Sequence, residues 1–168
     1  FYSARVLAQA GATASAGSAL YSLDLARGSS EKRVWADSVP GFLTDVSRDG
    51  KWGLWVQFRS QGDCTEMLLD LAKGTTKAIY PPVGGPKVQI WSARFSADGD
   101  RIYLSTDSGS EQALLLLLDR NGKELGRYAE KNPATADLED IAVAKSGDRI
   151  AIEISAGNHS DVRLLDAA

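Results

Sequence analysis

Few residues of this chain are of the types that carry out covalent or metal chemistry. The sequence has one histidine, His159, and one cysteine, Cys64. A Ser-His-Asp triad would have to use that histidine as its base, yet it lies in a Gly-Asn-His-Ser-Asp stretch that is typical of an exposed hairpin loop. One histidine and one cysteine are too few for an ordinary zinc site. We therefore expect no catalytic residue, no metal ion and no cofactor in these 168 residues.

Three short motifs are weak matches to catalytic or ion-binding loops. Ser15, within Thr13–Gly17, is placed as in a nucleophile elbow, but an elbow needs a helix after the serine, and Leu20–Leu25 predicts a strand. Asp119–Glu124 lacks the spaced carboxylates of a calcium loop. Pro81–Lys87 lacks the Lys-Ser/Thr pair of a phosphate-binding loop. We interpret the first two motifs as hairpin turns and the third as a linker.

The turns recur along the chain at a nearly constant interval. Ser47–Lys51 returns as Ser96–Asp100 and, more weakly, as Ala144–Asp148, so that the three glycines are 49 and 48 residues apart. Three further sets of residues keep the same phase: Asp24, Asp70, Asp119 and Asp166; Gly17, Gly62, Gly109 and Gly157; and Trp35, Tyr80 and Tyr128. Four markers in one phase indicate internal repeats of about 48 residues. We interpret the repeated aspartates as structural, since such side chains bond backbone N–H groups at turns.

Each repeat divides into four short strands bounded by turn residues. In the second repeat we expect strands at 41–46, 51–58, 64–71 and 76–80, with the Asp-Gly sequence as the turn between the first two. Four antiparallel strands per repeat are the signature of a propeller blade. The rivals are an open β-solenoid and a sandwich, and a sandwich would not keep the markers in phase. The predicted fold class is all-β, a partial β-propeller of four-stranded antiparallel blades.

The repeats predict a single partial propeller domain over 1–168 with an incomplete blade at each end. The first repeat, 1–39, has strands expected near 3–9, 19–25 and 32–36 and lacks the inner strand. The repeats 40–86 and 87–134 are whole blades. The last repeat, 135–168, has strands expected near 138–143, 149–154 and 160–166 and lacks the outer strand. Because open ends expose apolar faces and unpaired strand edges, we expect the isolated fragment to self-associate.

A family resemblance rests on the sequences inside these blades. Phe95–Gly99 followed by Ile102–Asp107, and the strand Leu68–Gly74, are similar to blades of TolB-type and prolyl oligopeptidase-type propellers. Asp137–Val143 and Arg163–Ala168 resemble the propeller of bacterial dipeptidyl aminopeptidase/acylaminoacyl peptidases, which are serine peptidases of the prolyl oligopeptidase family. The resemblance implies a noncatalytic N-terminal propeller segment that gates or docks peptides for a downstream α/β-hydrolase domain. The pattern departs where a serine, Ser146, replaces the aspartate of the turn.

The innermost strand of each blade is expected to line a central tunnel. Its polar residues are Thr44, Asp45, Ser92, Arg94, Glu139 and Asp140. From these we single out Arg94, Glu139 and Asp140 as the residues that contact peptide termini or a partner domain. The alternative is a solvated tunnel wall that binds nothing.

Composition narrows the remaining function classes. A net charge of -3 without a basic block predicts no nucleic-acid partner. The longest apolar run, Ala113–Leu118, is far shorter than a membrane span. A TolB-like scaffold for protein interactions in the bacterial envelope is the alternative function, and a propeller glycosidase or lyase would need more clustered carboxylates or metal ligands. Bacterial cytoplasm and periplasm are both compatible with a single cysteine.

Overall fold

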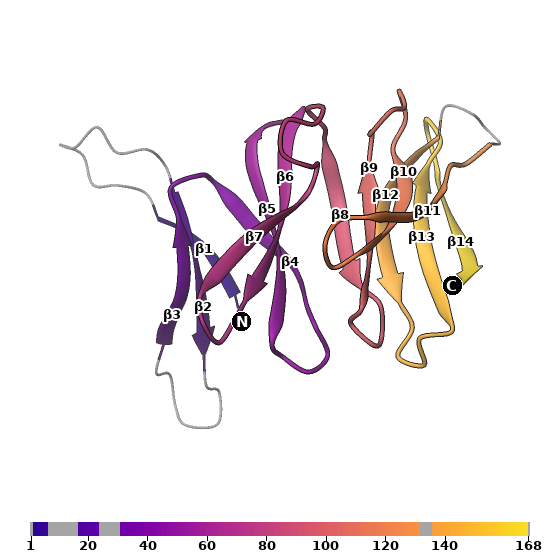
Figure 1. Cartoon of the computed structure of the whole chain (residues 1–168). Coiled ribbons are helices and arrows are strands. Elements are labelled where there is room, and N and C mark those ends of the chain that lie inside the picture. Colours follow the sequence, from indigo (N-terminus) through magenta and orange to yellow (C-terminus); the bar gives the residue numbers. More distant parts are fainter. Residues whose placement is uncertain (1, 7–16, 24–30, 132–135, 168) are drawn as a thin grey trace.

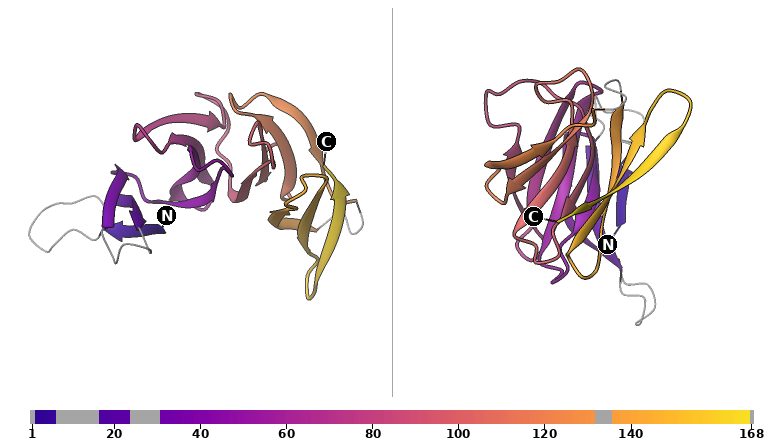
Figure 2. Two further views of the ribbon diagram at one scale, coloured as in Figure 1. Left: turned by 90° about the horizontal axis from the view of Figure 1, so that it is seen from below. Right: turned by 90° about the vertical axis from the view of Figure 1, so that its right-hand side faces the viewer.

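The computed structural model describes residues 2–6, 17–23, 31–131 and 136–167, and within them it contains only β-strands and their connections. Fourteen strands in this part of the chain form four separate antiparallel sheets. In each sheet the strands follow one another in sequence order, and the sheets stand in succession along an arc (Figure 1). Seen from below, the arc is open on one side (Figure 2). The chain is therefore a partial β-propeller, as its repeats predict.

The two central sheets have four strands each. The second sheet consists of β4 (Gly41–Val46), β5 (Trp52–Ser60), β6 (Asp63–Asp70) and β7 (Thr75–Tyr80). The third consists of β8 (Ile90–Phe95), β9 (Arg101–Thr106), β10 (Leu114–Asp119) and β11 (Glu124–Tyr128). Strands β4 and β8 contact each other, so the first strand of each sheet lies at the inner edge. The four strands expected for 40–86 lie within two residues of the observed ones.

The two outer sheets have three described strands each. The first consists of β1 (Tyr2–Val6), β2 (Gly17–Leu23) and β3 (Glu31–Asp37), and the fourth consists of β12 (Asp137–Val143), β13 (Arg149–Ser155) and β14 (Ser160–Asp166). Strand β12 contacts β8 and is the inner strand of its sheet. The outer sheets thus have the incomplete form that the sequence predicts. Among the described residues, no helix is long and apolar enough to cross a membrane.

The Asp-Gly sequences form the turns between the first and second strands. The N–H of Gly50 donates to the carbonyl of Ser47 over 2.8 Å, and the Ser47 hydroxyl donates to Asp49 over 2.7 Å. Gly50 has a φ of 70°, which is unfavourable for residues with a Cβ. The same bonds recur around Ser96 and Gly99. The turn interpretation is therefore confirmed.

The turns between third and fourth strands are held by repeated aspartates. Asp70 accepts the N–H groups of Ala72 and Lys73, each over 3.0 Å. Asp119 does the same with Asn121 and Lys123, over 2.7 and 2.9 Å. The structural interpretation is thus confirmed for these two residues. Asp24 lies outside the described residues.

Asp166, the last of the repeated aspartates, has a different environment. Its carboxylate lies 3.9 Å from the guanidinium of Arg149, and its side chain is 95% exposed. Within the described residues, no strand follows β14 to form a turn at this position. The interpretation of the repeated aspartates as residues that hold a turn therefore does not extend to Asp166.

Replacing Asp119 with asparagine is expected to lower stability slightly at neutral pH, because a neutral amide oxygen accepts backbone hydrogen bonds less strongly than a carboxylate. The hydrogen bond from the N–H of Lys123 is the largest cause that lowers the pKa of Asp119 below its usual value. Stability from a lowered carboxyl pKa is present above the unfolded-state pKa and is lost as pH falls through the folded-state pKa. Urea unfolding should show a gap between the two proteins at pH 7 that closes near pH 2. A gap that persists undiminished at pH 2 would contradict this account.

The apolar cores lie between neighbouring sheets. One cluster joins the second and third sheets, another joins the third and fourth, and a smaller one joins the first and second. These clusters contain, respectively, Val56 and Leu104, Leu115 and Ile152, and Leu20 and Trp55. Burying such side chains contributes about 1.5–3 kcal/mol each. Stacking of the sheets therefore supplies the stabilising contacts that a single sheet lacks.

Candidate functional site

Arg94 joins the inner strands of three sheets. It lies on β8, and its Nη1 donates to the backbone carbonyl of Thr44 on β4 over 3.0 Å. Its Nη2 lies 3.1 Å from Oδ1 of Asp140 on β12. The Arg94 side chain is 28% exposed, so it remains partly accessible to solvent. A guanidinium can make several such bonds at once because its donors form a planar fork.

Asp140 is the carboxylate that Arg94 holds. Its Oδ1 also accepts the hydroxyl of Ser92 over 2.7 Å and the N–H of Ile141 over 2.8 Å. Partial burial raises the pKa of Asp140, but the hydrogen bonds from Ser92 and Ile141 and the Arg94 charge outweigh it, so this pKa lies below its usual value. Asp140 is therefore ionised at neutral pH, with more than half of its side chain open to solvent.

Glu139 lies beside this pair on an irregular stretch of β12. The pairing register of β12 with β13 shifts between Leu138 and Asp140, so Glu139 is the extra residue of a β-bulge. Its side chain is exposed, and no hydrogen bond or ion pair of Glu139 is found within the described part of the chain. The structure thus pairs Arg94 with Asp140 and leaves the Glu139 carboxylate available for an incoming group.

The inner strands of the second, third and fourth sheets each contain a bulge, and the three bulges are equivalent. The register shifts between Leu43 and Asp45 in β4 and between Ile90 and Ser92 in β8. The bulge residues are Thr44, Trp91 and Glu139, at matching places in the repeat. Bulges re-aim side chains and are common next to functional sites. Sequence reasoning did not single out Trp91, because an aromatic residue in a strand reads as core, although this one is only partly buried.

Asp45, another polar residue of the inner strands, has a structural role. Its Oδ2 accepts the N–H of Phe95 on the next sheet over 2.8 Å, and its Oδ1 accepts the N–H of Val46 over 2.8 Å. Both oxygens are thus occupied by backbone donors. Asp45 helps to set the spacing of β4 and β8 and is not part of the candidate binding surface.

The residues considered for catalysis do not form a site in the described part of the chain. His159 is exposed, and its Nδ1 lies 3.2 Å from Oδ1 of the adjacent Asn158. Cys64 is a free, buried thiol whose pKa is raised mainly by that burial. Ser15 lies outside the described residues. Among the residues that are described, no group of three or more His, Cys, Asp or Glu side chains is placed to hold a metal ion.

Four stacked sheets with an inner polar row define this chain as a β-propeller segment. No protein-family model and no curated protein matches its sequence. Among solved structures, it is similar to TolB from Acinetobacter baumannii, with a TM-score of 0.66 and 22% identity over 89% of this chain and 35% of that one. A protein described as TolB from Agrobacterium tumefaciens matches with a TM-score of 0.65 and 15% identity over 89% of this chain and 57% of that one.

A prolyl endopeptidase is also similar, with a TM-score of 0.60 and 16% identity over 98% of this chain and 26% of that one. The chain therefore spans between 26% and 57% of the length of these three proteins. Both kinds of propeller that the sequence resembles thus appear among its structural neighbours, which establishes the propeller fold. At these identities the likeness is one of fold.

Proposed function

We propose that this chain is the noncatalytic propeller segment of a prolyl oligopeptidase-family serine peptidase and that it docks or gates peptides for a downstream α/β-hydrolase domain. The observation that carries the proposal is the inner acidic surface, defined as Glu139 and Asp140. One of these carboxylates is ion-paired with Arg94, and the other is exposed and unpaired among the described residues. Similarity to a prolyl endopeptidase over 98% of this chain supports it.

The inner acidic surface suits the positively charged amino terminus of a peptide. Arg94 neutralises part of the charge of Asp140 and fixes its position. Glu139 is the bulge residue beside it, and its exposed carboxylate has no ion-pair partner among the described residues. In this arrangement Glu139 and Asp140 contact the peptide ammonium group, and Arg94 is a positioning residue. Attraction between exposed charges is screened by salt, so binding should weaken as ionic strength rises.

Replacing Glu139 with glutamine is expected to weaken binding of a peptide with a free amino terminus by up to about fivefold, the upper end of the range for one exposed ion pair. The same peptide with an acetylated amino terminus should bind the two proteins equally. Calorimetric titration at low salt measures both affinities. Glu153→Gln, at an exposed glutamate on β13, is the matched control. Equal binding of the free and acetylated peptides by the unmodified protein would refute the assigned role.

A TolB-like scaffold for protein interactions is the second candidate function. It is favoured by the TM-scores of 0.66 and 0.65 to two TolB structures. Treating the full-length natural protein with a fluorophosphonate probe separates the two functions, because such probes label an activated serine. Labelling of the polypeptide that contains these residues would support the peptidase, whereas a folded protein that stays unlabelled would favour the scaffold.

A further inference from the structure

A polar pocket of about 350 Å³ lies beside the turns that join the first and second strands of the sheets. These turns of the second, third and fourth sheets lie together at one end of the stack, at the bottom of Figure 1. The second sheet contributes Arg48, the third contributes Asp98, Arg101 and Tyr103, and the fourth contributes Ser146. Small-molecule sites have volumes of about 300–1,000 Å³, so this pocket can hold a small ligand.

Arg48 reaches across three sheets to form one wall of the pocket. Its Nη2 donates to the backbone carbonyl of Lys145, in the turn of the fourth sheet, over 2.6 Å. The turn of the third sheet packs closely against that of the fourth, since a Cβ on Gly147 would lie 2.6 Å from the Cβ of Ala97. The bond to Lys145 uses one of several N–H donors of the guanidinium, so the other donors of Arg48 remain available for a ligand.

Arg101, the second arginine of the pocket, has no ionic partner among the described residues. It is partly buried, and neither an ion pair nor a hydrogen bond of its guanidinium is found in that part of the chain. The carboxylate of Asp98, which also lines the pocket, instead accepts the Ser96 hydroxyl over 2.5 Å and the N–H of Asp100 over 3.0 Å. Two arginines and one aspartate give the lining a net positive charge.

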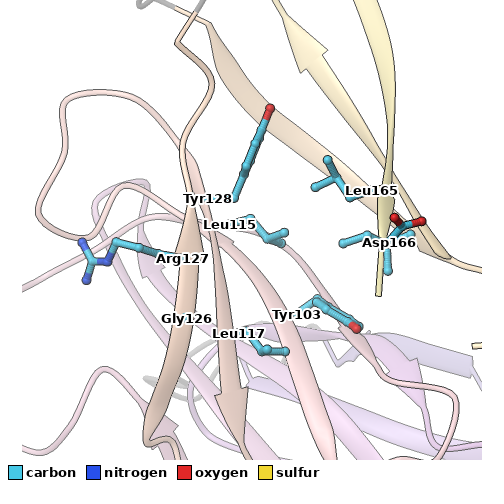
Figure 3. Close-up of a pocket in the computed structure, with 9 residues that line it drawn as sticks. Tyr103, Leu115, Leu117, Gly126, Arg127, Tyr128, Leu165 and Asp166 are labelled. Atoms are coloured by element: carbon cyan, nitrogen blue, oxygen red, sulfur yellow. The ribbon is translucent and has the colours of Figure 1, made fainter. Parts of the chain in front are cut away.

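Tyr103 supplies a further hydrogen-bond donor to the pocket. The residue is 3% exposed, and no hydrogen bond of its hydroxyl is found among the described residues. Burial raises the pKa of Tyr103, and the charges of Arg101 and Asp98 also act on it, so the hydroxyl lies towards these two residues and is protonated at neutral pH. Tyr103 also lines an apolar cavity between the same two sheets (Figure 3). Because buried hydroxyls are normally hydrogen-bonded, we expect an acceptor in the polar pocket.

Comparison within the repeat shows that this pocket is particular to the third and fourth sheets. Trp52 is paired with Asp70, the repeated aspartate of its sheet. Arg101 is paired with Asp119 in the same way, so it is the equivalent of Trp52. Between the second and third sheets, Trp52 packs against the apolar cluster, with the guanidinium carbon of Arg120 5.4 Å from the ring centroid. Between the third and fourth sheets, an arginine replaces that ring and borders a polar pocket.

We propose that this pocket, called the arginine pocket and defined by Arg48, Arg101 and Tyr103, binds the oxyanion group, carboxylate or phosphate, of a small ligand. A guanidinium binds such groups through two parallel N–H···O bonds. Arg101 and the Tyr103 hydroxyl donate to the oxyanion from the third sheet, and Arg48 donates from the second. None of these residues belongs to the inner acidic surface, so the arginine pocket does not depend on the proposed role in a peptidase.

Ligand-observed NMR on the full-length natural protein, at constant ionic strength, tests the arginine pocket. Binding of sodium acetate is followed by saturation transfer from the protein, and binding of sodium phosphate by broadening of its phosphorus line. Contacts with two charged donors predict a dissociation constant on the order of 1 mM. Binding of acetate alone would support a carboxylate ligand, binding of phosphate alone a phosphate ligand, and binding of both an oxyanion site without preference. Binding of neither anion would overturn the proposal.

Three variants separate the arginine pocket from the overall charge of the protein. Arg101→Gln should weaken binding at least about tenfold, because it removes a charged donor. Arg101→Trp, which introduces the residue of the second repeat, should abolish binding.

Arg149→Gln is the matched control for these variants. Arg149 has the equivalent position in the fourth repeat, where it is paired with Asp166, and its side chain is 61% exposed outside the pocket. This change should leave the affinity within about twofold. Thermal melts followed by circular dichroism establish that all three variants fold. The proposal is wrong if Arg101→Gln weakens binding no more than Arg149→Gln does.

Discussion

Replacing Glu66 with methionine is expected to stabilise the protein by about 4 kcal/mol at pH 8 and by much less at pH 5. Glu66 lies on β6 and is fully buried between the second and third sheets. Neither of its carboxyl oxygens has a hydrogen-bond partner. Burial raises the pKa of Glu66 from 4.5 to about 8, and the positive charge of Arg94 opposes this rise only in part.

The pH dependence follows from the direction of this shift. Below the unfolded-state pKa, the carboxyl group is protonated in both states and costs nothing through ionisation. As pH rises towards 8, the unfolded chain loses the Glu66 proton while the folded chain keeps it, so the unfolded state is favoured. Each unit between the two pKa values corresponds to about 1.4 kcal/mol. The penalty therefore grows from pH 4.5 and levels off above the folded-state pKa of about 8.

Urea unfolding between pH 5 and pH 8.5 measures the effect. The free energy of unfolding of the unmodified protein should fall across this range. Most of that fall should be absent in the Glu66→Met protein, because methionine has a similar length and no ionisable group. Glu153→Met, at an exposed position on β13, should leave the pH dependence unchanged. Parallel pH profiles for the unmodified and Glu66→Met proteins would show that Glu66 ionises freely in the folded state.

Sequence patterns predict the strands here because turn chemistry is local. An aspartate that accepts N–H groups two to four residues ahead, as Asp70 and Asp119 do, fixes a hairpin without reference to the rest of the fold. Repetition of these turns then dictates four strands per sheet. The strand positions from 41 to 80 could accordingly be predicted to within two residues.

Contacts between neighbouring sheets could be predicted only in part from the sequence. Placing Arg94 and Asp140 on neighbouring inner strands follows from the repeat, but their ion pair depends on the relative height of β8 and β12, which no local pattern encodes. The bulges at Thr44, Trp91 and Glu139 are register shifts against a partner strand and leave no signature in the sequence of one strand alone.

The burial of Glu66 is a second feature that local sequence patterns do not predict. A glutamate in an alternating strand is read as solvent-facing, since glutamate is almost never fully buried without a partner. Here the neighbouring sheet covers that face, because Glu66 shares its side of the second sheet with Val56. Whether both faces of a strand are buried depends on how the sheets stack. The spacing of residues within the repeat does not specify that stacking.

Gly122→Ala is expected to destabilise the protein by about 3 kcal/mol, and Gly50→Ala by only about 1 kcal/mol, although both glycines are in the left-handed region with φ values of 84° and 70°. The shared backbone strain costs about 1 kcal/mol for a residue with a Cβ. At Gly50 the added methyl group would have no other atom within 4 Å. At Gly122 it would collide with the carbonyl of Ile79, so the turn must also move away from β7, and such overpacking costs a further 1–3 kcal/mol by order of magnitude.

The pair of variants separates conformational strain from contact between sheets. Urea unfolding of both at pH 7 gives the two losses under identical conditions, with the denaturant dependence checked for each. The difference between them reports how closely the turn between β10 and β11 is packed on the second sheet. Lys77, whose Nζ donates to the Oδ1 of Asn121 over 2.9 Å, lies at the same contact. Equal losses for Gly122→Ala and Gly50→Ala would mean that the turn between β10 and β11 does not press against β7.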